Sequence, residues 1–199
     1  MDRPLRPWYR MDNASFMYSS IQRDQFSAIY RFSAVMTERV VPEALQAAVD
    51  RALPRFPGFA VKICRGFFWY YFEPNDAPGP YVREDVADPC RPVRFNEDSG
   101  WLIRFYYYRC RISLEVFHAL ADGAGAIAFF KAVLAEYLRQ LGRDIPPGEG
   151  IIDLDEPPKP EEREDAYLRY AGKASRALPR VSRAYQNRGT PEPFYTFHV

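Results

Sequence analysis

The stretch of sequence that decides the fold is Phe117-His118-Ala119-Leu120-Ala121-Asp122-Gly123, which joins a predicted strand to a predicted helix. On the strand side, Ile112, Leu114 and Val116 recur at every second position, and His118 continues their phase just past the last of them. A histidine at this edge of a sheet is held by rigid backbone while its ring reaches a cleft. On the other side, Asp122 stands at the N-cap of a helix that Gly142 ends.

The residue types at this junction suit proton transfer. Imidazole has the side-chain pKa that best matches proton transfer near neutral pH. The Asp122 carboxylate can accept hydrogen bonds from free N–H groups of the helix, pair with an arginine, and fix the turn that aims His118. Gly123 leaves room for a close approach. A capping aspartate and a histidine at a strand end are each ordinary structural features, so their combination at this junction is what favours a functional site.

The flanking segments predict an α+β fold with a mixed β-sheet flanked by helices. Pro42 suits the first turn of a helix that Pro54 ends, with Leu45, Ala48 and Val49 at helical spacing. A second helix follows the motif, with apolar residues three and four positions apart: Ile127, Phe130, Leu134, Tyr137, Leu138 and Leu141. We expect a polar and aromatic lead-in over residues 1–24, strands over 26–35, 59–64 and 67–72, mostly loop over 74–100, and a hairpin over 101–108 and 112–117.

The character of the chain changes after Gly142. The runs Pro146-Pro147-Gly148 and Pro157-Pro158-Lys159-Pro160 cannot continue regular structure, and residues 151–165 carry seven acids against two bases. We expect residues 1–142 to form a domain that carries the motif, residues 143–163 to be a linker, and residues 164–199 to form a helix and the start of a strand.

The pattern His118-x-x-x-Asp122-Gly123 after a strand resembles the signature of the chloramphenicol acetyltransferase-like superfamily. This superfamily includes coenzyme-A-dependent acyltransferases, alcohol acetyltransferases, wax-ester synthases and the condensation domains of nonribosomal peptide synthetases. Three further segments look like bacterial members described as alcohol acetyltransferase-like, namely residues 8–13, 53–57 and 66–71.

The resemblance implies transfer of an acyl group from acyl-coenzyme A to an alcohol or amine. His118 matches the general base that deprotonates the acceptor. Asp122 matches an aspartate with a mainly structural role and an arginine partner, for which Arg10, Arg23 and Arg104 are equal candidates. Acyl-coenzyme A is then a co-substrate, and no metal or permanently bound cofactor is expected.

Two departures from the superfamily pattern leave alternatives open. Phe117 stands where condensation domains carry a second histidine, which disfavours condensation on a carrier protein. The superfamily fold has two similar halves, and this chain resembles the N-terminal half, so residues 164–199 are expected to lead towards a C-terminal half or a second chain that completes the site. A non-catalytic half-domain used for binding or assembly is the alternative. The open apolar surface of a single half favours self-association.

Two aromatic runs, Phe67–Phe72 and Phe105–Tyr108, have two possible roles. A strand that is apolar on both faces is typical of one covered on both sides, and aromatic residues favour strands. We therefore expect both runs in the core of the sheet. The alternative is that they line an acyl channel.

The composition narrows the function classes further. With 199 residues, 47% of them hydrophobic, the chain can bury a core, and its net charge of +1 argues against a nucleic-acid binder. Cys64, Cys90 and Cys110 form no CxxC pair and suit a reducing compartment. No apolar run approaches the roughly 20 residues of a membrane span, and the N-terminus has no signal-peptide core. We expect a cytoplasmic protein.

Overall fold

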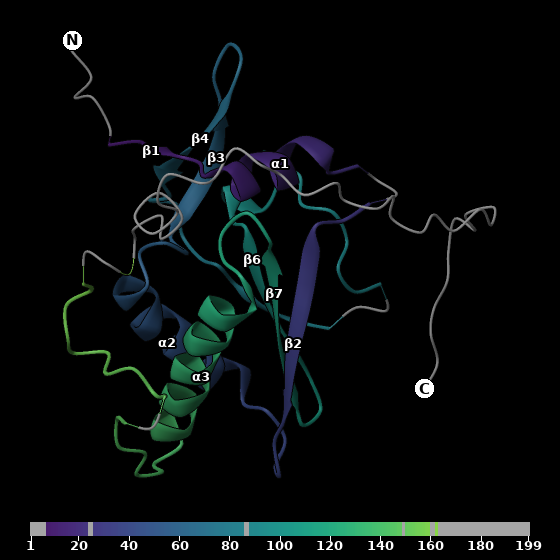
Figure 1. The fold of residues 1–199 in the computed structure, drawn as a ribbon. Helices are drawn as coiled ribbons and strands as arrows, with labels where there is room; N and C mark the ends of the chain where they lie inside the picture. Colours follow the sequence, from purple (N-terminus) through teal and green to yellow (C-terminus); the bar gives the residue numbers. More distant parts are fainter. Residues whose placement is uncertain (1–6, 24–25, 86–87, 149, 160–161, 163–199) are drawn as a thin grey trace, which may run out of the picture. The chain divides into compact units, whose positions relative to one another are not determined.

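The computed structural model describes residues 7–23, 26–85, 88–148, 150–159 and 162. In these residues, two β-sheets and three α-helices form the α+β fold that the sequence predicts (Figure 1). In chain order the elements are β1 (Tyr9–Arg10), α1 (Asn13–Ile21), β2 (Ile29–Val35), α2 (Pro42–Ala52), β3 (Val61–Arg65), β4 (Tyr70–Pro74), β5 (Val82–Glu84), β6 (Ile103–Tyr108), β7 (Arg111–Phe117) and α3 (Gly123–Gln140), with short 3-10 turns at Leu53–Arg55 and Asp98–Gly100.

The large sheet contains the strands β2, β7, β6 and β5 in that order. Three of its strands pair antiparallel, with Ile29 opposite Phe117 and Ile103 opposite Val116, and β5 joins β6 in parallel. The hairpin β6–β7 forms as expected, and it turns through Arg109, whose φ of 51° lies in the left-handed region. The strand β5 lies in a stretch that was expected to be loop.

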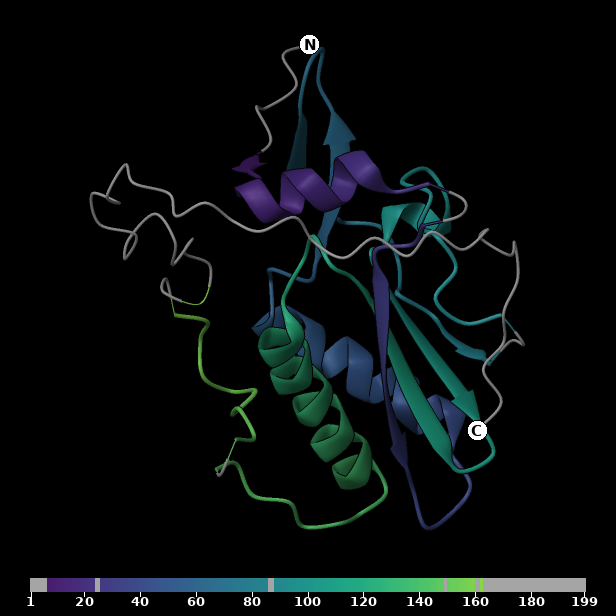
Figure 2. The same cartoon turned by 45° about the vertical axis from the view of Figure 1, so that its right-hand side comes forward.

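Helix α2 follows its sequence pattern closely. It begins at Pro42, where the missing N–H is not needed, and Leu45, Ala48 and Val49 are completely buried. Together with α3 it covers one face of the large sheet, and the main apolar core lies between these helices and the sheet (Figure 1 and Figure 2).

Helix α3 ends as predicted, but its buried face is wider than the expected stripe and differs from it at some positions. At the end of the helix, Gly142 has a φ of 78° and donates to the carbonyl of Arg139. Phe129 and Val133 are fully buried in the core, whereas Ile127 is 40% exposed. The expected stripe was therefore partly wrong, because α3 contacts both the sheet and α2 and so buries a wider face than a single stripe of apolar residues.

The small sheet contains β1, β4 and β3 in that order, and its hairpin is shorter than expected. Strand β4 begins at Tyr70, opposite Arg65, and the turn between them is closed by a hydrogen bond from the Gly66 N–H to the Trp69 carbonyl. Phe67 and Phe68 therefore lie in the turn and are almost fully exposed. The prediction that residues 67–72 form one strand covered on both sides was wrong.

A second apolar cluster links the small sheet to the end of β7, where the motif begins. It consists of Met11, Ala28, Ile63, Val93, Leu102, Phe117 and Ala119. This cluster fixes the position of the segment that follows β7 relative to α1 and the small sheet.

The segment after α3 has no helix among its described residues and makes specific contacts along α2 and the turn after it. Leu154 is buried in the main core, Arg51 pairs with Asp155, and the Arg55 guanidinium forms two hydrogen bonds with Glu162 at 2.5 and 2.9 Å. The helix and strand expected within residues 164–199 lie outside the described residues. In the part that the structure describes, no helix is both long and apolar enough to cross a bilayer.

Candidate active site

His118 directly follows the last residue of β7 and remains tied to both neighbouring strands. The His118 N–H donates to the carbonyl of Ala28 at 2.8 Å, and the Phe117 N–H donates to the carbonyl of Leu102 at 2.9 Å. Phe117 and Ala119 on either side are buried, whereas His118 is partly exposed. The backbone therefore fixes the point from which the imidazole projects, just past the end of β7 in the large sheet.

Two tyrosines hold the imidazole ring. Tyr18 on α1 stacks on it, with ring centroids 4.2 Å apart and an interplanar angle of 17°. Tyr30 on β2 meets it edge to face, with centroids 4.9 Å apart and an angle of 66°. We call these two rings the tyrosine clamp. Neither imidazole nitrogen makes a hydrogen bond to the described part of the chain, so the clamp orients the ring while its nitrogens remain available for proton exchange.

The turn after His118 is anchored by hydroxyl groups from two other elements. The buried Ser15 hydroxyl on α1 donates to the Ala119 carbonyl at 2.7 Å. The Tyr30 hydroxyl lies 2.9 Å from the Ala121 carbonyl and 3.0 Å from the Asp122 carbonyl. Burial, followed by the nearby charge of Asp122, raises the pKa of Tyr30, which keeps this hydroxyl protonated as a donor.

Asp122 caps α3 as predicted from its position. Its Oδ1 accepts a hydrogen bond of 2.8 Å from the Gly125 N–H, and its side chain is exposed. Among the described residues, no ion pair joins Asp122 to an arginine. Arg104, one of the candidates, instead lies 3.6 Å from Glu115 and 3.7 Å from Asp98.

Gly123 occupies the first position of α3, beside the proposed site. A Cβ atom added there would meet a single atom within 4 Å, Cζ of Phe32 at 3.8 Å, which is an ordinary contact distance. The packing of the described residues therefore does not itself require glycine at this position.

A buried charge network lies on the face of the large sheet opposite to α2 and α3. Arg31 on β2 donates to Asp85 at 2.8 and 3.0 Å and to Glu115 at 2.8 and 3.0 Å. Arg111 donates to Asp85 at 2.9 Å, and the Cys90 N–H donates to Glu115 at 2.6 Å. Because the network joins β2, β7 and the loop after β5, it stiffens the strands that carry Tyr30 and His118.

The electrostatics of this network favour the charged form of Asp85 and the neutral thiol of Cys90. Burial raises the pKa of Asp85, but hydrogen bonds from Arg31 and Arg111 outweigh it and hold that pKa below its ordinary 3.8. Burial, with the charge of Glu115, raises the pKa of the Cys90 thiol to about 11.

The contribution of α1 to the site was not predicted from the sequence. The segment was expected to be a polar and aromatic lead-in, with no helix predicted in it, although Asp12 accepts a hydrogen bond of 2.6 Å from the Ser15 N–H, as an N-cap residue does. An aspartate three positions before a serine was the available signal. The apolar residues Phe16 and Met17 are both exposed, so α1 lacks the apolar stripe by which helices are recognised.

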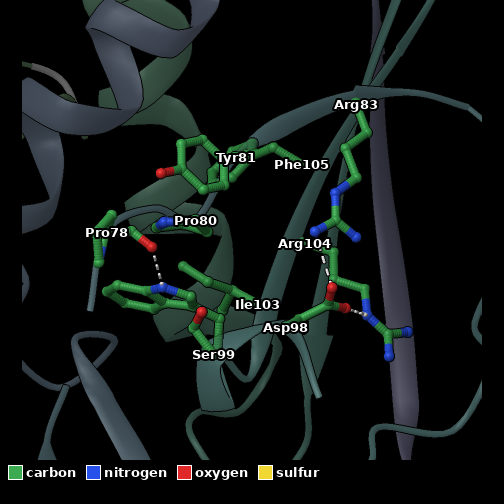
Figure 3. A pocket seen from close by; sticks show the side chains of 10 residues that line it. Pro78, Pro80, Tyr81, Arg83, Asp98, Ser99, Ile103, Arg104 and Phe105 are labelled. Atoms are coloured by element: carbon green, nitrogen blue, oxygen red, sulfur yellow. Dashed lines mark hydrogen bonds and ion pairs between the residues drawn. The ribbon is translucent and has the colours of Figure 1, made fainter. Parts of the chain in front are cut away.

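A separate pocket of about 100 Å³ lies between the segment before β5 and the start of β6 (Figure 3). Asp98 lies between two arginines there, 2.8 Å from Arg83 and 3.7 Å from Arg104, and the Trp101 indole N–H donates to the Pro78 carbonyl. His118 and Asp122 do not line it. The pocket is smaller than the 300–1,000 Å³ or so that encloses a drug-sized ligand, and both of its arginines already pair with Asp98. No cluster of metal-ligating side chains occurs in the described residues.

Comparisons with known proteins identify a fold that this chain shares with solved structures. No family model and no curated protein matches the sequence. Among solved structures, the starter condensation domain of rhizomide synthetase RzmA matches with a TM-score of 0.54 and 15% identity, over 70% of this chain and 40% of that one. A mutant of that domain in complex with C8-CoA matches at 0.53 and 15%, over 65% and 35%. The X-domain complex with OxyB from teicoplanin biosynthesis matches at 0.55 and 15%, over 74% and 36%.

These matches mean that the described chain has part of the fold of condensation domains. The chain spans at most 40% of the length of these solved structures. At 15% sequence identity, these matches show a shared fold. The chemistry of this chain has to follow from its own residues.

Proposed function

We propose that this chain is the N-terminal half of an acyltransferase that moves an acyl group from acyl-coenzyme A to an alcohol or amine. The observation that carries the proposal is the geometry of His118. The imidazole lies at the end of a sheet strand, is oriented by the tyrosine clamp, and keeps both nitrogens free of hydrogen bonds to the described residues. A base held in this way can accept a proton without first losing a protein partner.

In the proposed reaction, His118 takes the proton from the acceptor hydroxyl or amine as the acceptor oxygen or nitrogen attacks the thioester carbonyl. The new C–O or C–N bond forms, the C–S bond breaks, and the proton passes from His118 to the departing thiolate. Asp122 acts on His118 indirectly, because it caps α3 and thereby fixes the turn that follows the histidine. Gly123 leaves space beside this turn for the substrate.

The choice of donor and acceptor rests on two kinds of likeness. The matched rhizomide synthetase domain has been solved with C8-CoA, which supports a coenzyme A thioester as donor. The resemblance of residues 8–13, 53–57 and 66–71 to alcohol acetyltransferase-like proteins supports an alcohol as acceptor. We further propose that residues 1–142 are the half-domain, that residues 143–163 are the linker, and that residues 164–199 lead to the part that supplies the second wall of the site.

A second candidate function is binding without catalysis. One of the matched folds is an X-domain solved as a complex with OxyB, so proteins of this fold include one that binds a protein partner. In addition, Asp122 lacks an arginine partner among the described residues, which departs from the pattern that the resemblance implies.

A thiol-release assay distinguishes the two functions. It uses the complete protein, including any sequence that continues this chain, with C8-CoA as the donor and a series of alcohols and amines as acceptors. His118→Ala is expected to lower the rate by about 10²–10⁴-fold with an unchanged circular dichroism spectrum. The control His198→Ala removes the chain's other histidine and is expected to retain the rate. A folded His118→Ala protein with wild-type turnover overturns the assignment of the base. A complete protein without turnover favours the binding function.

A further inference from the structure

The turn of the β3–β4 hairpin carries three consecutive aromatic residues that pack against little of the described chain. The exposed fractions are 93% for Phe67, 89% for Phe68 and 55% for Trp69. We call these three residues the aromatic tip. In both views the hairpin extends beyond α1 and the large sheet (Figure 1 and Figure 2). Large apolar side chains at such exposure indicate an interaction surface, because their transfer out of water is favourable.

The aromatic tip is a formed structure of the hairpin. The Gly66 N–H donates to the Trp69 carbonyl at 2.8 Å, which closes the turn. The Trp69 indole lies against the same glycine, where a Cβ atom would be 3.3 Å from the ring. The rings of Phe67 and Phe68 lie 6.4 Å apart and are tilted by 40°. The three residues thus lie in a closed turn at the end of a hairpin that extends beyond the neighbouring elements.

Two exposed arginines, Arg10 and Arg65, belong to the strands behind the aromatic tip. Arg65 is exposed at the end of β3, and the exposed Arg10 lies opposite Tyr71 in β1. Residues 9–10 and 61–74 contain three bases, Arg10, Lys62 and Arg65, and one acid, Glu73, which lies 3.9 Å from Lys62. The hairpin is therefore apolar at its end and basic behind it.

We propose that the aromatic tip inserts into the interfacial region of a lipid bilayer that contains anionic lipids. A bilayer accepts the apolar end of a hairpin without a complementary groove, aromatic side chains favour its interfacial region, and basic residues add attraction to anionic head groups. A second copy of the chain is the alternative occupant that the test distinguishes. The pocket of Figure 3 holds about 100 Å³ and is lined by charged Arg83, Asp98 and Arg104, which does not fit three aromatic rings.

The test is sedimentation of the purified chain with vesicles of phosphatidylcholine, with and without phosphatidylglycerol, at low and high salt. We expect binding to the anionic vesicles that weakens at high salt. The variant Phe67→Ser/Phe68→Ser is expected to bind at least about tenfold more weakly. The matched control Phe16→Ser/Met17→Ser removes two adjacent exposed apolar residues from α1 and is expected to bind like wild type.

Trp69 provides a second readout. Trp101 is 4% exposed, so in a Trp8→Phe variant the exposed indole is that of Trp69, and its emission should shift to the blue on addition of anionic vesicles. Absence of sedimentation and of a shift in the wild-type chain overturns the proposal. The proposal is also overturned if both double variants lose vesicle binding equally. A third contrary outcome is a wild-type chain that does not bind vesicles but self-associates, with the self-association lost in Phe67→Ser/Phe68→Ser. Because no acyl donor is present, these outcomes are independent of the proposed transferase activity.

Discussion

At His118, aromatic contacts replace the hydrogen bonds that usually orient a histidine. Tyr18 and Tyr30 fix the plane of the imidazole from two different elements, and the Tyr30 hydroxyl also holds the turn that follows. Tyr30 therefore couples the ring to its supporting backbone. A histidine that must gain and lose a proton benefits from such support, because ring stacking does not compete for the nitrogens.

Replacement of Asp122 tests whether its structural role is limited to capping. Asp122→Ala is expected to lower the free energy of unfolding by about 0.5–2 kcal/mol, because the Gly125 N–H loses its acceptor. Asp122→Asn retains an oxygen at this position and is expected to retain most of the stability. The measurement is urea unfolding of both variants. A loss above about 3 kcal/mol would instead indicate a charged partner of Asp122, as expected when a buried ion pair is broken.

The Cys90 thiol offers a probe of the buried charge network. With its pKa raised to about 11, the reactive thiolate near pH 8 is about a hundredfold scarcer than for a thiol with a pKa of 9.0. Alkylation with iodoacetamide, followed by mass spectrometry, should therefore modify Cys90 more slowly than Cys110 in the β6–β7 turn. In urea the two rates should become equal. Equal rates in the folded protein would contradict the burial of Cys90.

At the scale of the elements, the two faces of the large sheet are stabilised by different interactions. One face packs apolar side chains against α2 and α3, whereas the other holds Arg31, Asp85 and Glu115 in the charge network. Buried ion pairs stabilise a fold less than their short distances suggest, but removal of one member leaves a buried charge without its partner. The network therefore makes the stability of the sheet dependent on pH.

Asp85 gives the sign of that dependence. Its pKa is lower in the folded chain than its ordinary 3.8, so its contribution to stability is complete above that value and is lost as the pH falls through the lowered pKa. Asp85→Asn is expected to be less stable than wild type by about 1–3 kcal/mol near neutral pH, with a difference that shrinks below about pH 4. Urea unfolding over a pH series measures it.

Glu38→Gln is the matched control for Asp85→Asn. Glu38 and its partner Arg143 are both more than half exposed, at 75% and 63%, so their 3.4 Å ion pair should contribute little at any pH. A stability difference for Asp85→Asn that stays constant from neutral pH to acid would refute the role of ionised Asp85.

The elements that could be predicted from the sequence are those whose buried residues lie on one face and recur at a regular spacing. Helix α2 has Pro42 at its start and three fully buried residues at helical spacing, and the β6–β7 hairpin has alternating apolar positions. The aromatic tip was misassigned because aromatic residues favour strands, while a four-residue turn closed at Gly66 depends on pairing that the local sequence does not reveal. The charge network joins Arg31 to Glu115, 84 residues away, and no local pattern predicts such a contact.

At the scale of the whole molecule, the described residues supply one wall of the candidate site. His118, Asp122 and the tyrosine clamp come from β7, β2, α1 and the start of α3, and the matched solved structures are more than twice as long as the part that this chain covers. The motif and its junction could be predicted from the sequence, whereas groups that would stabilise the oxyanion of an acyl-transfer reaction could not be assigned to this chain.

We therefore predict that the 199-residue chain alone releases no thiol from C8-CoA above the rate in buffer, because oxyanion stabilisation supplies a large share of acyl-transfer catalysis. Addition of the proposed C-terminal half, as a separate chain or in fusion, is expected to produce turnover that His118→Ala removes. The assay compares the chain, the added half and the mixture. Clear turnover by the chain alone would show that one wall is sufficient.

The strand order of the large sheet also sets the order in which the protein can fold during synthesis. Strand β2 leaves the ribosome early. Its neighbour β7 does not emerge until a further 84 residues have been synthesised, counted from Arg31 to Glu115. Helix α2 and the β3–β4 hairpin can form from local contacts in that interval, whereas Tyr30 and Phe32 wait without the partners that cover them. The nascent chain thus carries β2 without its hydrogen-bonding neighbour until β7 emerges.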